Sequence, residues 1–396
     1  MKRLVCAAVL AAACGGGGGS TPTAPPAPVT PPTTALPNGT LLADRAALYP
    51  RVIRLAHNGD ANGRLLLAYV TFPGGAYGQG QIVQSADDGR TWSATPVGAI
   101  RDTSAHGLCC STLYEVPRAT GGLAEGTLLW AASVGQDESN RRMAIRVWRS
   151  TDRGASWSYL SSCAVSPNSG GLWEPEFSVA ADGRLVCHYS DEAQQPQHSQ
   201  TLMRAYSPDG GATWSAPAAT VSSIFTGYRP GMATVRQLPT GTYVMTYEVC
   251  GLPGAANCAA HLRTSPDGLD WGDPTDIGTR VLARDGRYFA HAPVLALAPG
   301  GGANGRLLLV GQLVFTAAGT QDASAGQLLM INASGGGGAW DTAPAPFAVP
   351  NVYDNYCPNY SSSPLASEDG ARVLLVATAC DGPTCKAYFG VGALAP

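Results

Sequence analysis

The sequence contains little charge. Charged residues make up 13% of its 396 positions, and the formal net charge is −3. A surface that binds nucleic acid needs a concentrated basic patch, and the sequence offers none, so we expect no nucleic-acid partner. The apolar run at residues 4–13 is also too short to be a transmembrane helix, which needs roughly 20 such residues.

Two common kinds of chemistry leave no trace in the sequence. No GxSxG phrase marks a serine-hydrolase nucleophile. The six histidines are scattered without ligand spacing, and the adjacent Cys109 and Cys110 have no CxxC partner nearby. We therefore expect no metal ion and no cofactor, although loop carbonyls that hold calcium would leave no signature.

The N-terminus has the pattern of an export signal. Lys2 and Arg3 precede the short apolar run, which ends in LAAAC at Cys14. This ending resembles a bacterial lipoprotein signal, with Cys14 as the lipidated residue, and a GGGGGS tether follows it. The alternative is ordinary secretion after cleavage near Ala13. We divide the chain into a signal (1–14), a Gly/Pro/Thr-rich linker (15–37) and one domain (38–396), and expect an exported monomer whose only membrane contact is the Cys14 anchor.

Export permits disulfides. Eleven cysteines less Cys6 and Cys14 leave nine, an odd number. Spacing alone does not fix the connectivity. It favours three pairs, which are Cys250 with Cys258, Cys380 with Cys385, and Cys163 with Cys187. Cys109 and Cys110 form either a vicinal bridge or bonds to separate partners.

Abundant glycine (49) and proline (30) favour a turn-rich β protein, and a repeat supports this reading. Six strongly apolar runs recur about every 60 residues, at 64–72, 126–134, 183–190, 241–249, 305–314 and 371–379. A strand-like run precedes each, at 49–55, 109–116, 174–180, 231–238, 292–298 and 360–366, and a third one follows. This period predicts an all-β, six-bladed β-propeller, in which residues 39–43 add the outer strand of the last blade.

A short phrase recurs at the end of several third strands. It reads SADDGRTW (85–92), STDRGASW (150–157), SPDGGATW (207–214) and, one residue shorter, SPDGLDW (265–271). Serine and aspartate can bond the N–H groups of a tight turn, and glycine permits positive φ. We interpret the phrase as a hairpin clasp whose tryptophan starts the fourth strand and packs on the blade. It resembles the Asp-box, or BNR repeat, of the sialidase-like superfamily, which implies that the active site lies on the opposite face.

The active face of such a propeller collects the starts of first strands and the ends of second strands. Those positions hold acids, bases and aromatic residues, a combination suited to a sugar. First-strand starts contribute Tyr49, Arg51, His106, Trp173, Glu174, Glu176, Tyr228, Arg229, His291, Asn359 and Tyr360, and second-strand ends contribute Asp191, Glu192, Glu248 and Gln312. We expect arginine and tyrosine to bind hydroxyls and Trp173 to stack on a ring.

Glu248 is the strongest single signal because it ends an otherwise apolar strand, where an unpartnered carboxylate is rarely tolerated. A structural salt bridge to Arg229 or Arg263 is the alternative. Glycosidic bond cleavage needs one protonated and one ionised carboxyl group. Glu174, beside Trp173, is the favoured second member, and Glu176 and Asp191 are further acids with candidate substrate-binding roles.

The phrases WEPEF, YSDE, HSQTL, YRPGM and TYVMTYEVCG occur in this order between residues 173 and 251. They resemble the central blades of glycoside hydrolase family 93, the exo-α-1,5-L-arabinanases, which release arabinobiose with retention. The resemblance implies Glu174 as acid/base and Glu248 as nucleophile, with Arg229 and Tyr360 contacting the substrate. Residues 106–133 depart from the family pattern, which leaves the sugar open.

Two alternatives remain at this stage. An exo-sialidase would need three arginines that clamp a carboxylate. Arg51 and Arg229 could contribute, but blades five and six offer His291 and Tyr360 instead of a third. A surface-tethered propeller that binds carbohydrate without cleaving it would have the same fold, because fold alone does not imply function.

Overall fold

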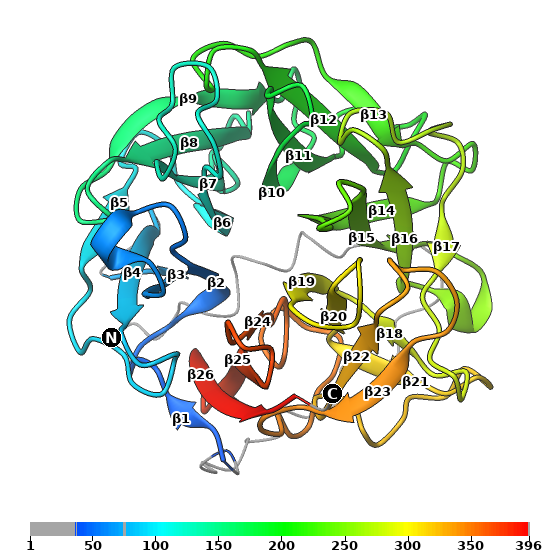
Figure 1. Ribbon diagram of the computed structural model, residues 1–396. Helices are drawn as coiled ribbons and strands as arrows, with labels where there is room; N and C mark the ends of the chain where they lie inside the picture. Colours follow the sequence, from blue (N-terminus) through cyan, green and yellow to red (C-terminus); the bar gives the residue numbers. More distant parts are fainter. Residues whose placement is uncertain (1–35, 37, 74–76, 395–396) are drawn as a thin grey trace, which may run out of the picture.

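The computed structural model describes residues 36, 38–73 and 77–394, and these form a six-bladed β-propeller (Figure 1). The predicted signal and nearly all of the linker, including Cys14, lie outside the described residues. The only helical elements in the described part are the one-turn 3₁₀ helices η1 (Gly59–Ala61) and η2 (Gly254–Ala256). No helix in this part is long and apolar enough to span a membrane.

Each blade is an antiparallel sheet whose first strand is innermost. Blades 1 to 3 contain β2 (Leu48–Arg54), β3 (Leu65–Thr71), β4 (Gln79–Ser85) and β5 (Gly98–Arg101); β6 (Cys109–Glu115), β7 (Leu128–Val134), β8 (Ala144–Ser150) and β9 (Ser158–Val165); and β10 (Leu172–Val179), β11 (Leu185–Asp191), β12 (Thr201–Ser207) and β13 (Ala218–Val221). Blades 4 to 6 contain β14 (Arg229–Gln237), β15 (Tyr243–Cys250), β16 (Ala259–Ser265) and β17 (Thr279–Arg280); β19 (Val294–Ala298), β20 (Arg306–Val310), β22 (Leu328–Asn332) and β23 (Asp341–Pro344); and β24 (Ser363–Ala366), β25 (Arg372–Asp381), β26 (Thr384–Ala393) and β1 (Thr40–Leu41).

The ring closes as the sequence predicts. Thr40 and Leu41 of β1 pair with Phe389 and Tyr388 of β26, so the first strand of the chain completes the last blade (Figure 1). A short pair, β18 (Tyr288–Ala290) and β21 (Leu313–Phe315), extends the sheet of blade 4 towards blade 5. The apolar faces of adjacent blades pack on one another, which gives the ring a continuous core.

Each innermost strand begins with a repeated backbone irregularity. Every blade has at least one non-glycine residue with positive φ there, namely Tyr49 (50°), Cys110 (59°), Glu174 (55°), Met232 (60°), His291 (63°) with Ala292 (49°), and Asn359 (59°) with Ser361 (56°). In blades 1 to 4 the register with the second strand also shifts at this point. A left-handed conformation costs such a residue about 1 kcal/mol or more, and bulges of this kind re-aim side chains. The positive φ is therefore common to all six blades, whereas the bulge is present in blades 1 to 4, and both lie at the face where the sequence predicts the site.

The Asp-box turns form the predicted clasps on the opposite face. In the first copy, Asp87 Oδ1 accepts the N–H of Thr91 at 2.9 Å, and Ser85 Oγ accepts the N–H of Gly89 at 3.0 Å. Gly89 has a φ of 82°, which a residue with a side chain rarely adopts. The second and third copies repeat these bonds.

The Asp-box tryptophans differ from expectation. They precede the fourth strands instead of starting them, and they pack against the preceding blade. Trp92 meets Phe389 of blade 6 edge-on at 6.2 Å, and Trp214 Nε1 donates to Ser161 Oγ of blade 2 at 2.9 Å. In blade 5, Trp340 is 1% exposed and bridges to Ala283, although its turn lacks the Asp-box aspartate. These tryptophans thus fill the space between neighbouring blades and pack against both.

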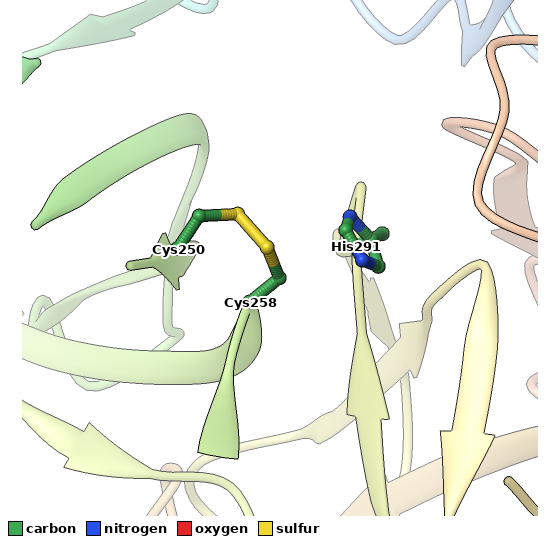
Figure 2. A group of neighbouring side chains, drawn as sticks. All are labelled: Cys250, Cys258 and His291. Carbon is green, nitrogen blue, oxygen red and sulfur yellow. A yellow bond between two sulfur atoms is a disulfide. The ribbon is translucent and has the colours of Figure 1, made fainter. Parts of the chain in front are cut away.

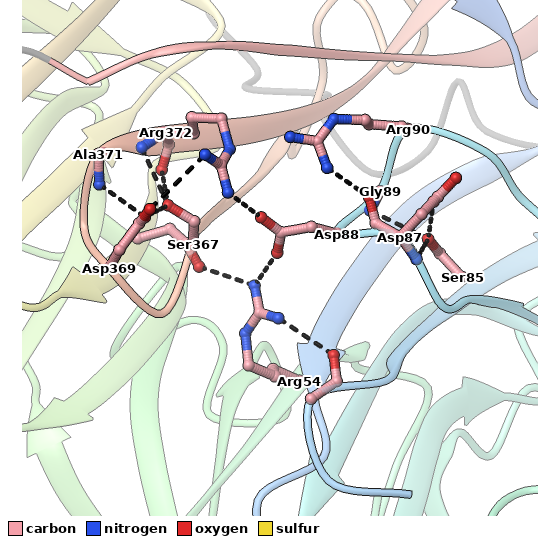
Figure 3. A network of polar contacts seen from close by, with 12 residues as sticks. Arg54, Ser85, Asp87, Asp88, Gly89, Arg90, Ser367, Asp369, Ala371 and Arg372 are labelled. Carbon is pink, nitrogen blue, oxygen red and sulfur yellow. Dashed lines mark hydrogen bonds and ion pairs between the residues drawn. The ribbon is translucent and has the colours of Figure 1, made fainter.

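The first Asp-box also joins blade 1 to blade 6 through Asp88 (Figure 3). Its carboxylate accepts Arg54 Nη2 at 2.5 Å and Arg372 Nη2 at 3.0 Å, from β2 and β25. The Asp88 side chain is 19% exposed, so solvent screens these bonds only in part. This network therefore stabilises the interface between blade 1 and blade 6, where the ring closes.

Asp88→Asn is therefore expected to destabilise the protein by about 1–3 kcal/mol, because it removes the shared anion and leaves two arginines facing a neutral amide. Asparagine tolerates the positive φ of this position (63°), so backbone strain is not added. Urea unfolding measures the effect. Asp60→Asn is the control. Asp60 pairs with Arg153, but its side chain is 81% exposed, so its replacement should change the free energy of unfolding little. An unchanged midpoint for Asp88→Asn would refute the role of the network.

Three disulfides are present among the described residues. Cys163–Cys187 and Cys250–Cys258 are those that the spacing favours. The third is Cys357–Cys385, so the predicted Cys380–Cys385 pair is wrong. Cys380 does lie directly opposite Cys385 in the β25–β26 ladder, but the loop before β24 brings Cys357 to the same sulfur. Cys109 and Cys110 are not bridged.

Candidate active site

Glu174 lies at the bulge of β10, on the active face near the propeller axis. Its Oε2 accepts the hydroxyl of Ser190 at 2.8 Å, and Ser190 Oγ accepts the N–H of Met232 from the next blade at 3.1 Å. The Glu174 side chain remains partly exposed. The short chain of hydrogen bonds fixes one carboxylate oxygen and leaves the group in reach of solvent.

Glu248 lies near the end of β15, one blade further on. Its Oε2 accepts the N–H of Ala292 at 2.7 Å, and Ala292 is a positive-φ residue just before the innermost strand of blade 5. Glu248 is 9% exposed. The alternative of a structural salt bridge is not realised, because neither Arg229 nor Arg263 is bonded to it.

Burial raises the pKa of Glu174 to about 7 and that of Glu248 to about 8. The negative charge of Glu174 adds to the shift at Glu248, so the two groups are near enough to interact. Arg229 and the hydrogen bonds oppose both shifts without cancelling them. The pair therefore holds about one proton near neutral pH.

An ion pair borders the two glutamates. Arg229 Nη2 donates to Glu192 Oε1 at 2.5 Å and to Gln200 Oε1 at 2.8 Å, while Nη1 donates to Ser199 Oγ at 2.9 Å. Glu192 also accepts the N–H of Gly171 at 3.2 Å. Arg229 is thus held in a fixed orientation beside the two glutamates.

Tyr49, Tyr360 and Arg51 lie together on the blade 1 and blade 6 side of the axis. The two tyrosine rings meet edge-on at 5.6 Å, and the Tyr360 hydroxyl lies 3.3 Å from Met232 Sδ. Arg51 binds inward to Ser361, with Nη1 donating to its carbonyl at 3.0 Å and Nη2 to its hydroxyl at 2.8 Å. Arg51 therefore joins two blades.

Two residues assigned to substrate binding are engaged inside the protein. Trp173 is 3% exposed and the Arg141 guanidinium lies 5.2 Å from its ring centroid, so the expected stacking on a sugar is not available to it. Glu176 lies deeper on β10, where it accepts Arg236 Nη1 at 2.6 Å and Thr112 Oγ1 at 3.0 Å. Its part is to link blades 2, 3 and 4.

Asp191 also lies elsewhere than expected. Successive side chains of a strand point to opposite faces, so Glu192, not Asp191, reaches Arg229. Asp191 instead turns towards blade 2, and its Oδ1 accepts the N–H of Ala193, in the loop after β11, at 2.6 Å. Tyr228 precedes β14 on the active face and its ring lies 4.9 Å from that of Phe225, which is 58% exposed.

His291 stands at the edge of the site beside the Cys250–Cys258 disulfide (Figure 2). The three side chains offer ligand atoms within 4.8 Å of one another, but the disulfide leaves the cysteines without thiolates, which a metal would require. Burial lowers the pKa of His291, while Asp354, 3.7 Å from its Nδ1, opposes the shift. A neutral histidine beside Glu248 is suited to hydrogen bonding.

The sequence places Glu192 on the active face without giving it a role, and it does not single out Ser190, Asp354 or Ala292. Ser190 bonds Glu174, Glu192 pairs with Arg229, and Asp354 and the N–H of Ala292 face Glu248. Ser190 lies directly opposite Trp173 in the β10–β11 ladder, a register that could have been inferred from the strands. Nothing in the sequence pattern points to the N–H of Ala292 or to Asp354, which lies in a loop.

Six blades, Asp-box turns on one face and paired acids on the other define an Asp-box β-propeller. The model of the BNR repeat-like domain matches residues 45–227. No curated protein matches the chain.

Among solved structures, the chain is similar to an α-L-arabinanase of Penicillium chrysogenum complexed with arabinobiose, at 23% identity over 92% of this chain and 99% of that one, with a TM-score of 0.73. The α-L-arabinofuranosidase of Fusarium graminearum with arabinobiose is 23% identical over 90% of this chain and 98% of that one, with a TM-score of 0.71. A sialidase of Trypanosoma rangeli is 14% identical over 88% of this chain and 55% of that one, with a TM-score of 0.52. These likenesses establish a shared fold.

Proposed function

We propose that the protein is an exo-acting glycoside hydrolase that cleaves α-1,5-linked arabinan and releases arabinobiose by a retaining, two-carboxylate mechanism. The observation that carries the proposal is the pair Glu174 and Glu248, two interacting acids with raised pKa values at the axis. Such a pair supplies one acid and one base or nucleophile at neutral pH. The arabinobiose complexes of two proteins with this fold support the choice of sugar.

Glu174 is proposed as the general acid/base. It is partly exposed, so it can exchange its proton with water between the two steps, and Ser190 fixes its position. It first protonates the leaving glycosidic oxygen and then takes a proton from the attacking water. Both steps are standard for the acid/base of a retaining enzyme.

Glu248 is proposed as the nucleophile. The N–H of Ala292 orients one oxygen, and burial removes competing water. With a pKa of about 8, Glu248 itself is largely protonated near neutral pH. A sugar whose anomeric carbon becomes positive would lower that pKa and shift the proton to Glu174. Attack by the Glu248 carboxylate then forms a glycosyl ester, which water cleaves.

The sialidase alternative needs arginines that are available to a substrate carboxylate. Arg51 binds Ser361, Arg229 binds Glu192, and Arg236 binds Glu176. A carboxylate substrate would have to displace these partners, whereas a neutral sugar can hydrogen-bond beside them. The site therefore favours a neutral substrate.

Product analysis tests the proposal. The purified protein is incubated with linear α-1,5-arabinan and, in parallel, with sialyl-lactose, and the products are separated by anion-exchange chromatography. Arabinobiose as the first and main product is expected. Free sialic acid would transfer the assignment to a sialidase, and the absence of product from both would contradict the proposed activity.

A further inference from the structure

A cavity separate from the axial site lies on the flank of the propeller, between blades 2 and 3. Its volume is about 710 Å³, within the range of ligand sites in proteins. The lining extends from Trp214, in the third Asp-box on the far face, along β9 to Asp191 and Gln194 beyond the end of β11 on the active face. We call this cavity the flank groove.

Aromatic rings form one part of the flank groove. Tyr159 is 55% exposed, its ring packs edge-on against Trp148 at 5.8 Å, and its hydroxyl lies 3.0 Å from Ser162 Oγ. Trp214 is partly exposed, and its bond from Nε1 to Ser161 Oγ holds the indole plane in place. Flat, fixed and partly exposed rings of this kind offer faces on which the C–H surface of a sugar ring can stack.

Polar groups stand among these rings. Hydroxyl groups of Ser161, Ser162 and Thr213 and the amide of Gln194 line the flank groove, together with the Asp191 carboxylate. Asp191 is 7% exposed, and only its Oδ1 has a bond within the protein, to the N–H of Ala193. Its Oδ2 is available as an acceptor, and a carboxylate oxygen can accept hydrogen bonds from adjacent sugar hydroxyls.

The charge of the flank groove excludes one class of ligand. Of the described residues that line it, none is lysine, arginine or histidine, and the one charged group is the Asp191 carboxylate. An anionic polymer would meet an uncompensated negative charge in a partly buried place. A neutral, hydroxyl-rich chain meets stacking surfaces and acceptors at no such cost.

From these observations we infer that the flank groove is a second, non-catalytic binding site for a neutral polysaccharide chain. Asp191 and Glu192 are neighbours that face opposite ways, the first into the groove and the second to Arg229 at the axial site. A chain held in the groove would keep the protein on its polysaccharide while the axial site acts. The inference does not depend on which sugar the axial site cleaves.

The test measures binding separately from turnover. The Glu248→Gln variant of the full chain is run in native gels that contain linear arabinan, galactomannan or polygalacturonate, and dissociation constants are taken from the retardation. We expect retardation by at least one neutral polymer and none by the anionic one. Adding Tyr159→Ala or Asp191→Asn should weaken that binding by about fivefold or more.

Trp214→Ala should have the same effect, and Trp157→Ala is its matched control. Trp157 holds the same Asp-box position in blade 2 but does not line the groove. Equal binding with and without Tyr159 and Asp191, or retardation by polygalacturonate alone, would overturn the inference. If the protein releases arabinobiose but its binding to polysaccharide does not depend on Tyr159, the binding role of the flank groove is refuted and the proposed activity stands. If binding depends on Tyr159 but no arabinan is hydrolysed, the proposed activity is refuted and the flank groove stands.

Discussion

Glu248→Gln and Glu174→Gln are each expected to lower kcat/KM on linear α-1,5-arabinan by about 10³-fold or more, because each removes one of the two groups that move electrons or protons at the anomeric centre. Initial rates of arabinobiose release measure the effect. Glutamine preserves the shape of each side chain and can still accept the hydrogen bond from Ser190 or Ala292. Folding should therefore be preserved, which circular dichroism checks.

The same site allows the two roles to be separated. In Glu174→Ala, which has lost the general acid, a substrate whose leaving group needs no protonation should still form the glycosyl ester on Glu248. Sodium azide should attack this ester and give a glycosyl azide of retained configuration. In Glu248→Ala, azide should replace the nucleophile and give the inverted azide, because Glu174 can still protonate the leaving group. Proton NMR of the products distinguishes the two anomers. The opposite pattern would exchange the roles, and full activity of either variant would remove that glutamate from the mechanism.

Glu248→Gln is also expected to stabilise the fold, and more so as the pH rises. Burial raises the pKa of Glu248 from its ordinary value of 4.5 to about 8 in the folded protein. A carboxyl group with a raised folded-state pKa binds its proton more tightly when folded, so the wild type loses stability as pH rises through that interval. The glutamine variant loses nothing. We expect a gain of under about 1 kcal/mol at pH 5 and about 3 kcal/mol at pH 8.

Urea unfolding of both proteins at pH 5 and pH 8 measures this difference. Glu125→Gln is the control, because that side chain is 55% exposed and pairs only with the partly exposed His57, so its replacement should change the free energy of unfolding by less than about 1 kcal/mol. A Glu248→Gln gain that stays constant between the two pH values would contradict the burial of an acid at this position. A loss of activity together with a gain of stability is the pattern expected of a catalytic group that the fold tolerates at a cost.

The sequence alone determined the architecture. Local rules suffice for this, because each blade is a set of adjacent hairpins and each Asp-box is closed by residues within eight positions of one another. The sequence also singled out two candidate acids, Glu248 because it ends an otherwise apolar strand and Glu174 because it starts a strand beside Trp173. It predicted a closing strand at residues 39–43, where the structure has β1 (Thr40–Leu41). It also favoured the two disulfides Cys163–Cys187 and Cys250–Cys258.

Only the tertiary structure decided how the blades meet. Trp214 reaches blade 2, Asp88 joins blades 1 and 6, and Cys357 displaces Cys380 as the partner of Cys385, all through contacts between segments distant in sequence. The bulges at the starts of the innermost strands turn side chains in ways that simple alternation does not predict. The packing of whole blades decides which way Asp191 and Glu192 face and which residues they contact. The sequence around each residue does not contain this information, because the contacts come from other blades.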